Sequence, residues 1–559
     1  MTVVPHQSDP PEDIGLHSEA TRYLCAAAHT DETFTERVLA EAFDDDLRAV
    51  APSVGFDLTT VLRHCLHARR RRCGRDAWLL LTGGAAVLIS PLWTLLAAAA
   101  MTLATALTPR RHPRHDLLAP LLGTLTAALA SGILLLQLDR VAEDTSGDPL
   151  LDWLVGRPWL ALPFGVAAYL ALVLHLAGTR WLLATRLRRG LFRPPTTPPT
   201  EEGRHGTRLA ALQAAQRGNV TVYGGYDPFV GYGDPVVGWS FALPIVAADP
   251  LVGRPDQPTT TVTFDVVDLI DHVRDHLAAV RADPAGLDGL AGLVLQDRVF
   301  VHGRLLTDDR RLLPDRQRMP RQRFTDQQVR QVAARPRGAA RHYLCALVPS
   351  WGGEVVAGTF LHFSTDGKVL YLECARTVLQ PPRLGYHDVD RLTEWLPATH
   401  LVRLLTTGTQ TLLRTALGAP ARLARDLLRE GRHGRRQARL RRLAREDLGY
   451  DYGARTGVRE LATGTGYHNY FQVLDAAKHL KVVERHVLAA IVDFLDARGV
   501  DAAEFRTRQT TILNQGVIQT GGLSVVGNQA VGAGARADQT NTPDQGTTGD
   551  TTGRQRRDT

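Results

Sequence analysis

Three long apolar runs between Ala77 and Gly178 constrain the fold of this chain more than any other feature of its sequence. Residues 117–138 and 159–178 each supply about the 20 apolar residues that a helix needs to cross the hydrocarbon of a bilayer. Neither run contains Asp, Glu, Lys or Arg. We therefore expect a multi-pass membrane protein rather than a soluble helical bundle, whose helices are seldom so uniformly apolar.

The first apolar run, residues 77–107, is too long for one comfortable span. Gly83-Gly84 and Ser90-Pro91 interrupt it, and a proline removes a helical N–H donor and disfavours helix at the preceding residue. The run is therefore predicted to form two short helices, residues 77–89 and 92–107. These helices make either a tight spanning hairpin or a re-entrant loop.

The charges between the runs predict the orientation of the chain. Arginines precede the first run at positions 69–72, and more arginines follow it at positions 110, 111 and 114. The loop at 139–158 instead carries more acidic than basic residues, and arginines return after Gly178. Because basic segments stay in the cytoplasm, we expect four crossings of the inner membrane with both termini cytoplasmic.

The predicted domain organisation follows from these spans and from shifts in composition. An N-terminal cytoplasmic helical segment precedes an α-helical transmembrane region, and a basic, proline-rich linker leads into a cytoplasmic α+β domain with an antiparallel sheet. Arginine-rich and C-terminal helices, a β-prone segment and a disordered tail follow. The expected boundaries are 1–76, 77–178, 179–206, 207–395, 396–505, 506–537 and 538–559.

The predicted spans lack charged side chains, whereas transporters and pumps usually need ionisable groups at membrane depth. Small residues in the runs allow close contact between helices, so an anchor or assembly platform is the better interpretation. All five cysteines fall on the predicted cytoplasmic side, and we expect free thiols.

Arginine is concentrated again at residues 400–447, where leucines supply an apolar side. A basic amphipathic helix of this kind suits anionic headgroups, and ordinary packing against the domain is the alternative. Nucleic acid is an unlikely partner because few aromatic residues are interleaved for base stacking. With the border arginines, this helix supplies the predicted membrane-surface contacts: Arg69, Arg70, Arg71, Arg72, Arg186, Arg188, Arg189, Arg422, Arg425, Arg429 and Arg436.

Within the α+β domain, glycine-containing turns at 350–353 and 365–367 predict a meander of strands over 341–348, 354–363 and 369–377. The helix expected at 266–281 has Asp268, His272 and His276 on its polar side. Two histidines at positions i and i+4 can share one metal ion, so these residues are the predicted metal site. A solvated polar face explains the same residues, and the sequence indicates no cofactor.

A loop at 224–235 is dense in glycine and aromatic residues. Glycine permits positive φ there, and the aromatic side chains suit a contact surface for a ligand or a protein partner. The residues predicted to form it are Tyr223, Tyr226, Asp227, Phe229, Tyr232 and Asp234. A purely structural turn is the alternative.

The segment Thr510–Ala537 is uncharged up to Arg536 and rich in Gly, Asn and Gln. Such segments suit self-assembly or strand addition to a partner, and this one resembles the amyloid-signalling motifs of bacterial signalling proteins. The whole chain resembles multi-pass membrane proteins of GC-rich bacteria. The short segments at residues 20–25 and 222–229 carry that resemblance, which indicates no catalytic activity.

These observations favour a non-enzymatic scaffold or sensor that the bilayer anchors and that recruits a protein partner or assembles with itself. A metal-dependent or other enzymatic module on the cytoplasmic face is the first alternative. A small oligomeric channel is the second, and the absence of intramembrane charges counts against it.

Overall fold

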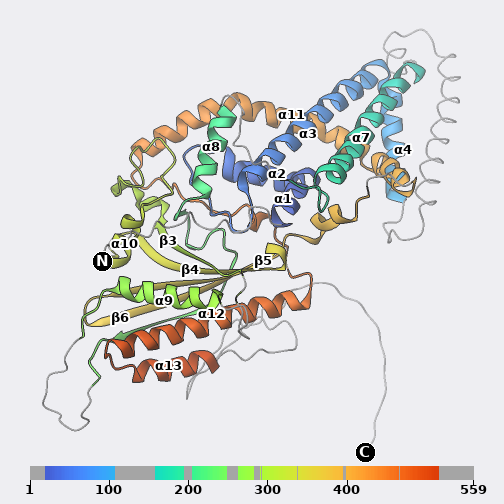
Figure 1. Cartoon of the computed structure of the whole chain (residues 1–559). Coiled ribbons are helices and arrows are strands. Elements are labelled where there is room, and N and C mark those ends of the chain that lie inside the picture. Colours follow the sequence, from blue (N-terminus) through green and yellow to red (C-terminus); the bar gives the residue numbers. More distant parts are fainter. Residues whose placement is uncertain are drawn as a thin grey trace, which may run out of the picture. The chain divides into compact units, whose positions relative to one another are not determined.

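A mixed six-stranded sheet with the strand order β1-β3-β4-β5-β6-β2 lies at the centre of the fold (Figure 1). The predicted meander is confirmed, because β4, β5 and β6 pair antiparallel in sequence. The strands are β1 (Val220–Tyr223), β2 (Asp234–Pro244), β3 (Val294–His302), β4 (Ala340–Ser350), β5 (Val355–Thr365) and β6 (Val369–Leu379). Residues of β4 are almost continuously buried, as expected for a strand covered on both faces.

The prediction of an antiparallel sheet is wrong at one edge, where β1 pairs in parallel with β3. A parallel pair needs a long crossover, and here the chain between the two strands builds β2 and α9 (Val266–Ala282). Strand β2 was not predicted. It pairs with β6 at the opposite edge through a bulge between Val236 and Trp239. Gly238 allows this approach, since a Cβ there would lie 2.2 Å from the Cys374 carbonyl oxygen.

The computed structural model describes residues 19–107, 158–193, 204–248, 262–282, 290, 292–336, 338–393, 398–464 and 466–514. By internal contacts the chain divides into one unit ending at Gln509 and another from Thr510 to Thr559. The predicted span 117–138 and most of the predicted β-prone segment lie outside the described residues. The start of that segment is helical, because α13 covers Ala503–Asn514.

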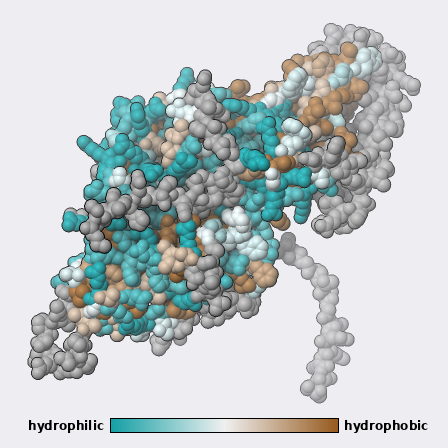
Figure 2. Space-filling view, in the orientation of Figure 1, coloured by the Kyte–Doolittle hydropathy of each residue, from teal (hydrophilic) through white to brown (hydrophobic). Residues whose placement is uncertain are grey.

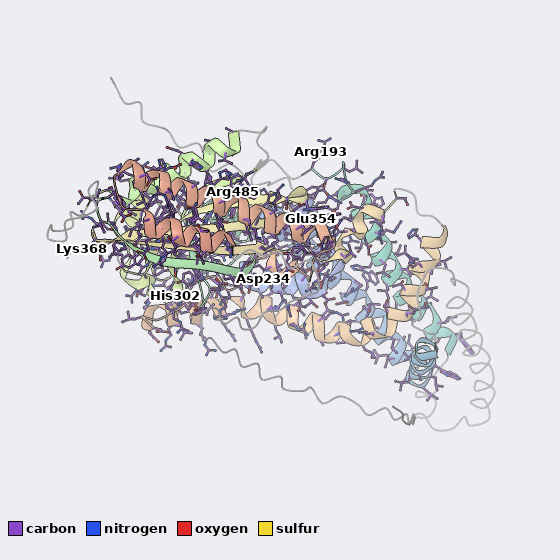
Figure 3. All side chains as sticks on the ribbon, turned by 90° about the horizontal axis from the view of Figure 1, so that it is seen from below. Arg193, Asp234, His302, Glu354, Lys368 and Arg485 are labelled. Carbon is purple, nitrogen blue, oxygen red and sulfur yellow. The ribbon has the colours of Figure 1, made fainter. Side chains whose placement is uncertain are left out.

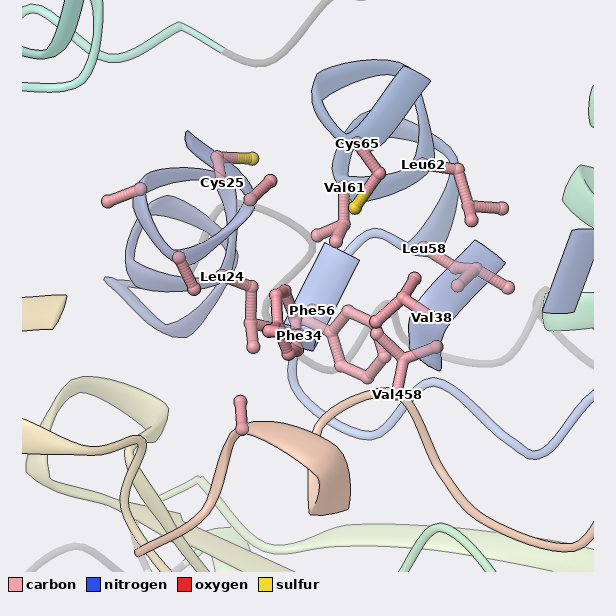
Figure 4. Packing of buried hydrophobic residues seen from close by; sticks show 14 of the residues in the cluster. Leu24, Cys25, Phe34, Val38, Phe56, Leu58, Val61, Leu62, Cys65 and Val458 are labelled. Carbon is pink, nitrogen blue, oxygen red and sulfur yellow. The ribbon is translucent and has the colours of Figure 1, made fainter. Parts of the chain in front are cut away.

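The N-terminal helices α1 (Glu19–Thr30), α2 (Glu32–Val38) and a π-helical turn, η1 (Leu39–Phe43), pack with the start of α3 (Leu58–Ile89). Their apolar core joins side chains such as Leu24, Phe34 and Val61 (Figure 4). Asp57 is the N-cap of α3, and its side chain accepts the Thr59 N–H. All five cysteines are free thiols, as expected.

Helix α3 continues through the arginine cluster to Ile89, and the predicted break at Ser90-Pro91 is present. There the chain bends by 119° into α4, Pro91–Leu107. Helix α7 (Pro158–Arg186) runs beside α3. Among the described residues, α7 alone is long and apolar enough to cross a membrane as one helix, and α3 with the start of α4 qualifies as a bent pair. The described residues therefore contain one or two candidate spans, where four crossings were expected.

Two layers of helices enclose the sheet (Figure 1). Helices α9 and α12 (Tyr470–Ala497) pack on one side, with α13 beyond them, and the N-terminal helices lie on the other side. The basic segment is one long helix, α11 (Ala398–Glu446), which contacts α3, α4 and α7. The other helices that the structure describes are α8 (Arg204–Gln216), η2 (Gly303–Asp308), α10 (Asp326–Ala334), η3 (Trp351–Gly353), η4 (Leu384–Arg391) and η5 (Glu460–Ala462).

Candidate membrane interface and metal-ligand cluster

Large apolar side chains project outward from the bundle of α3, α4 and α7. Only 17% of the apolar window of α7 is buried within the protein. Figure 2 shows this apolar surface at the end of the molecule where the bundle projects. Its exposed members include Trp78, Leu81, Leu88, Leu95, Trp159, Leu162, Leu174 and Trp181. Contiguous exposed apolar surface of this kind marks a contact with a membrane or another protein.

The first half of α11 packs into this bundle, which the sequence did not predict. Ala419 is buried against Leu79 of α3 and Ala168 of α7. At Gly408 the helices approach so closely that a Cβ would lie 2.9 Å from Val173 of α7. Small residues at such crossings are typical of helix packing within membranes.

Arginine–aspartate pairs join α3 to α11 beside the bundle. Asp76 is 2% exposed, and the Arg422 guanidinium donates to both of its carboxylate oxygens at 2.6 and 2.9 Å. Two helical turns earlier in α3 and one turn later in α11, Arg69 pairs with Asp426 at 3.2 Å. Bidentate pairs of this kind set both the distance and the orientation of their helices.

The arginines predicted at the membrane surface divide into two groups. Several are engaged within the protein: Arg71 donates to the carbonyls of His175 and Gly178, and Arg72 is buried and donates to Ala28 and Thr35. Arg69 and Arg422 make the pairs just described. The others are exposed or half-buried: Arg70, Arg186, Arg188, Arg189, Arg425, Arg429 and Arg436. Two of these also form ion pairs, Arg189 with Glu19 at 3.8 Å and Arg425 with Glu36 at 3.3 Å.

The aromatic loop is mainly a core element. Phe229 and Tyr232 are buried and pack against Phe360 with ring centroids 4.5 and 4.8 Å away, whereas Tyr226 is fully exposed. Tyr223 packs partly buried against the same cluster, Asp227 accepts from the Phe229 N–H, and Asp234 begins β2.

The Glu460 carboxylate holds this loop. It accepts the backbone N–H groups of Gly231, Gly233 and Gly457 at 2.7, 3.0 and 2.6 Å. Burial raises the pKa of Glu460, although the three N–H donors act in the opposite direction. Gly231 and Gly233 both have positive φ, so the glycines that the sequence singled out shape this turn.

The structure does not bring the three predicted metal ligands together. Asp268 pairs with Arg498 at 2.9 Å, which gives its carboxylate another partner. The His272 ring packs against Phe494, with ring centroids 5.6 Å apart. His276 lies beside His486 of α12, with ring centroids 5.8 Å apart.

A different set of ligand-type side chains does converge. The nearest ligand atoms of Glu354, His387 and His468 all lie within 4.8 Å of one another. His387 Nε2 is 3.1 Å from the Glu354 carboxylate, and the two imidazoles meet edge to face with centroids 4.8 Å apart. Sequence reasoning missed this cluster because its residues are far apart in the chain and share no motif.

The electrostatics of the two histidines differ. Burial alone lowers the pKa of His387, but the hydrogen bond and charge of Glu354 outweigh it, so the pKa is raised. Burial and the neighbouring His387 lower the pKa of His468. Glu354 lies at the start of β5, at the opposite end of that strand from Lys368 (Figure 3).

No curated protein and no solved structure matches the chain. One family does: residues 238–528 are similar to the AbeC-like domain. The matched region includes Glu354, His387 and His468, whereas α3, α4 and α7 precede it. The membrane location and the GC-rich bacterial source remain predictions. Because the match covers more than half of the chain, the protein belongs to the AbeC-like domain family.

Proposed function

We propose that this protein is a membrane-anchored scaffold or sensor on the cytoplasmic face of the inner membrane, where it recruits a protein partner. The observation that carries the proposal is the exposure of the apolar side chains of α3, α4 and α7. Trp78, Leu81, Leu88, Leu162 and Leu174 are each at least 59% exposed. A bilayer removes such surface from water without any change in the fold.

The surroundings of this bundle support the proposed orientation. Arg70, Arg186 and Arg189 remain exposed near the ends of the apolar segments, where anionic headgroups attract them. The ion pairs between α3 and α11 lie at the same end of the apolar part of α3 as Arg70. They couple the bundle to the domain that holds the sheet.

Strand β2 supports the recruitment of a partner. It lies at the end of the strand order and has no strand on its outer side among the residues that the structure describes. Its side chains are largely exposed, and Val237 is 81% exposed. An extended peptide can add to such an edge through backbone hydrogen bonds.

The anchoring is tested by labelling single added cysteines in intact cells with a membrane-impermeant maleimide. Ser146→Cys lies in the acidic loop expected outside, and Asp366→Cys lies in the exposed β5–β6 turn. We expect labelling of Ser146→Cys in intact cells, and labelling of Asp366→Cys only after permeabilisation. Equal labelling of both, or recovery of the protein without membranes, refutes the proposal.

The recruitment is tested by pull-down from detergent-solubilised membranes. Val237→Lys places a charge on the exposed edge of β2, and Leu305→Lys is the matched control at an exposed position outside β2 and the aromatic loop. A third version stops before Thr510. Loss of a partner with Val237→Lys assigns recruitment to the edge, and loss on truncation assigns it to the tail. Identical complexes from all versions refute both assignments.

A further inference from the structure

We propose that Glu354, His387 and His468 form a binding site for Zn²⁺, with a coordination position open to solvent. Two imidazoles and one carboxylate are the protein ligands of open, three-ligand zinc sites. The three ligand atoms already lie within 4.8 Å of one another, close to the separations that a shared ion requires. Binding would draw these atoms closer to one another through rotation of the three half-buried side chains.

The surroundings of His387 favour its role as a ligand. Its Nδ1 lies 3.3 Å from the Arg383 carbonyl oxygen, which accepts the Nδ1–H, and its Nε2 lies 3.1 Å from the Glu354 carboxylate. Nε2 is therefore the nitrogen that would give up its proton to bind a metal ion. A hydrogen bond from the second ring nitrogen to a carbonyl is the usual way that a zinc-bound imidazole is oriented. The ring also packs on Tyr23, with centroids 3.8 Å apart.

Tyr23 is itself held in place. Its hydroxyl donates to Asp390 at 2.7 Å, and Asp390 pairs with the buried Arg22 at 2.6 Å. The Asp390 carboxylate is therefore already engaged in orienting the Tyr23 ring, which packs against His387. This arrangement leaves Glu354 as the carboxylate ligand.

The other two ligands start from fixed backbone positions. The Glu354 N–H donates to the Trp351 carbonyl at 3.2 Å, and the buried Arg459 guanidinium donates to the Glu354 carbonyl. His468 directly precedes Asn469, the N-cap of α12, and its N–H donates to Gln472 at 2.9 Å. The site thus joins the start of β5, η4 and the start of α12.

A simple ion pair accounts for only part of this arrangement. His387 and Glu354 alone form such a pair, which leaves the position of His468 unexplained. Among the described residues, the His468 imidazole has no hydrogen-bond partner, and all three side chains are half-buried rather than enclosed. A metal ion uses the free nitrogen of His468 and remains accessible to a water molecule at its fourth position.

The test is a Zn²⁺ titration of the full-length, detergent-solubilised protein after chelator treatment, followed by calorimetry and elemental analysis. The variants are Glu354→Gln, His387→Gln and His468→Gln. The matched control is His272→Gln with His276→Gln, which removes an i, i+4 histidine pair elsewhere. We expect one Zn²⁺ per chain in the wild type and the control, and at least about 100-fold weaker binding in each ligand variant.

A readout independent of calorimetry is the visible spectrum of the Co²⁺-loaded protein, whose intensity distinguishes tetrahedral from octahedral coordination. His468→Gln is the variant that keeps the test decisive if His387→Gln fails to fold, because the contact it removes is the edge-to-face packing of one half-buried ring on His387. Wild-type binding no tighter than that of His468→Gln overturns the proposal. Loss of binding in the control, or a preference for Fe²⁺ over Zn²⁺, also overturns it.

Discussion

The buried histidine pair His29 and His64 predicts that acid destabilises the N-terminal helical layer. His29 Nε2 lies 3.0 Å from His64 Nδ1, with His67 nearby, and His29 is 8% exposed. Burial, with the neighbouring histidines and arginines, lowers the pKa of His29 from 6.5 to about 2. Burial, with His67 and Arg186, lowers that of His64 from 6.5 to about 4.

The sign of the effect follows from proton uptake. The unfolded chain protonates both histidines as the pH falls through 6.5, while the folded chain keeps them neutral until far lower pH. Stability is therefore lost as the pH falls below that value. At about pH 5.5 each histidine costs about 1.4 kcal/mol of unfolding free energy, so the pair costs about 3 kcal/mol.

The assay is denaturant unfolding of the full chain in one detergent at about pH 7.5 and about pH 5.5. The double variant His29→Gln with His64→Gln is compared with the wild type, and His302→Gln of β3 is the control. The double variant should lose about 3 kcal/mol less than the wild type on acidification, whatever its own stability at neutral pH. An unchanged pH dependence in the double variant refutes the reasoning.

Three further substitutions test the contacts that hold the layers together. Glu460→Ala leaves three backbone N–H groups without their acceptor and should cost about 2–3 kcal/mol in denaturant unfolding. Asp76→Ala leaves Arg422 without its bidentate partner, and should cost about 3 kcal/mol and expose α11 to limited proteolysis. Gly408→Leu inserts a side chain against Val173, and overpacking of this kind should cost about 1–3 kcal/mol in thermal unfolding.

Exposed or open positions in the same elements provide the controls. Glu430→Ala alters α11 at an exposed position and should change stability by less than about 0.5 kcal/mol. Gly431→Ala, also exposed within α11, should stabilise the protein by about 0.5–1 kcal/mol because alanine favours the helix. A Glu460→Ala variant that is as stable as the wild type contradicts the role of the Glu460 carboxylate in holding the loop. An unaltered proteolysis pattern for Asp76→Ala, or unaltered melting for Gly408→Leu, contradicts the packing of α11 against α3 or α7.

Local patterns in the sequence were sufficient for much of the fold. The alternation and glycine turns of β4, β5 and β6 specify hairpins that close over a few residues, and Ser90-Pro91 ends α3 for steric reasons that act within one turn. Asp57 caps α3 through a contact two residues away. Such features depend on neighbours along the chain, so the sequence displays them directly.

Other local patterns are compatible with two structures, and tertiary contacts determine which of the two forms. Thr33 and Glu36 have the spacing of a capping box, yet Asp31 is the N-cap of α2 and accepts the Phe34 N–H. The aromatic residues of the 224–235 loop suit either a contact surface or a core. Phe229 and Tyr232 belong to the core because both pack against Phe360. Strand β2 depends on β6, because its own bulge breaks the alternation that marks a strand.

The sequence by itself determined where the apolar runs and many of the regular elements lie, because periodicity and charge bias act over short stretches. Only the tertiary structure brought Asp76 to Arg422 and gathered Glu354, His387 and His468 at one point. Those residues lie on separate elements whose contacts depend on the whole fold. The physical reason is that ion pairs and ligand sites need closeness in space, which spacing along one chain does not specify.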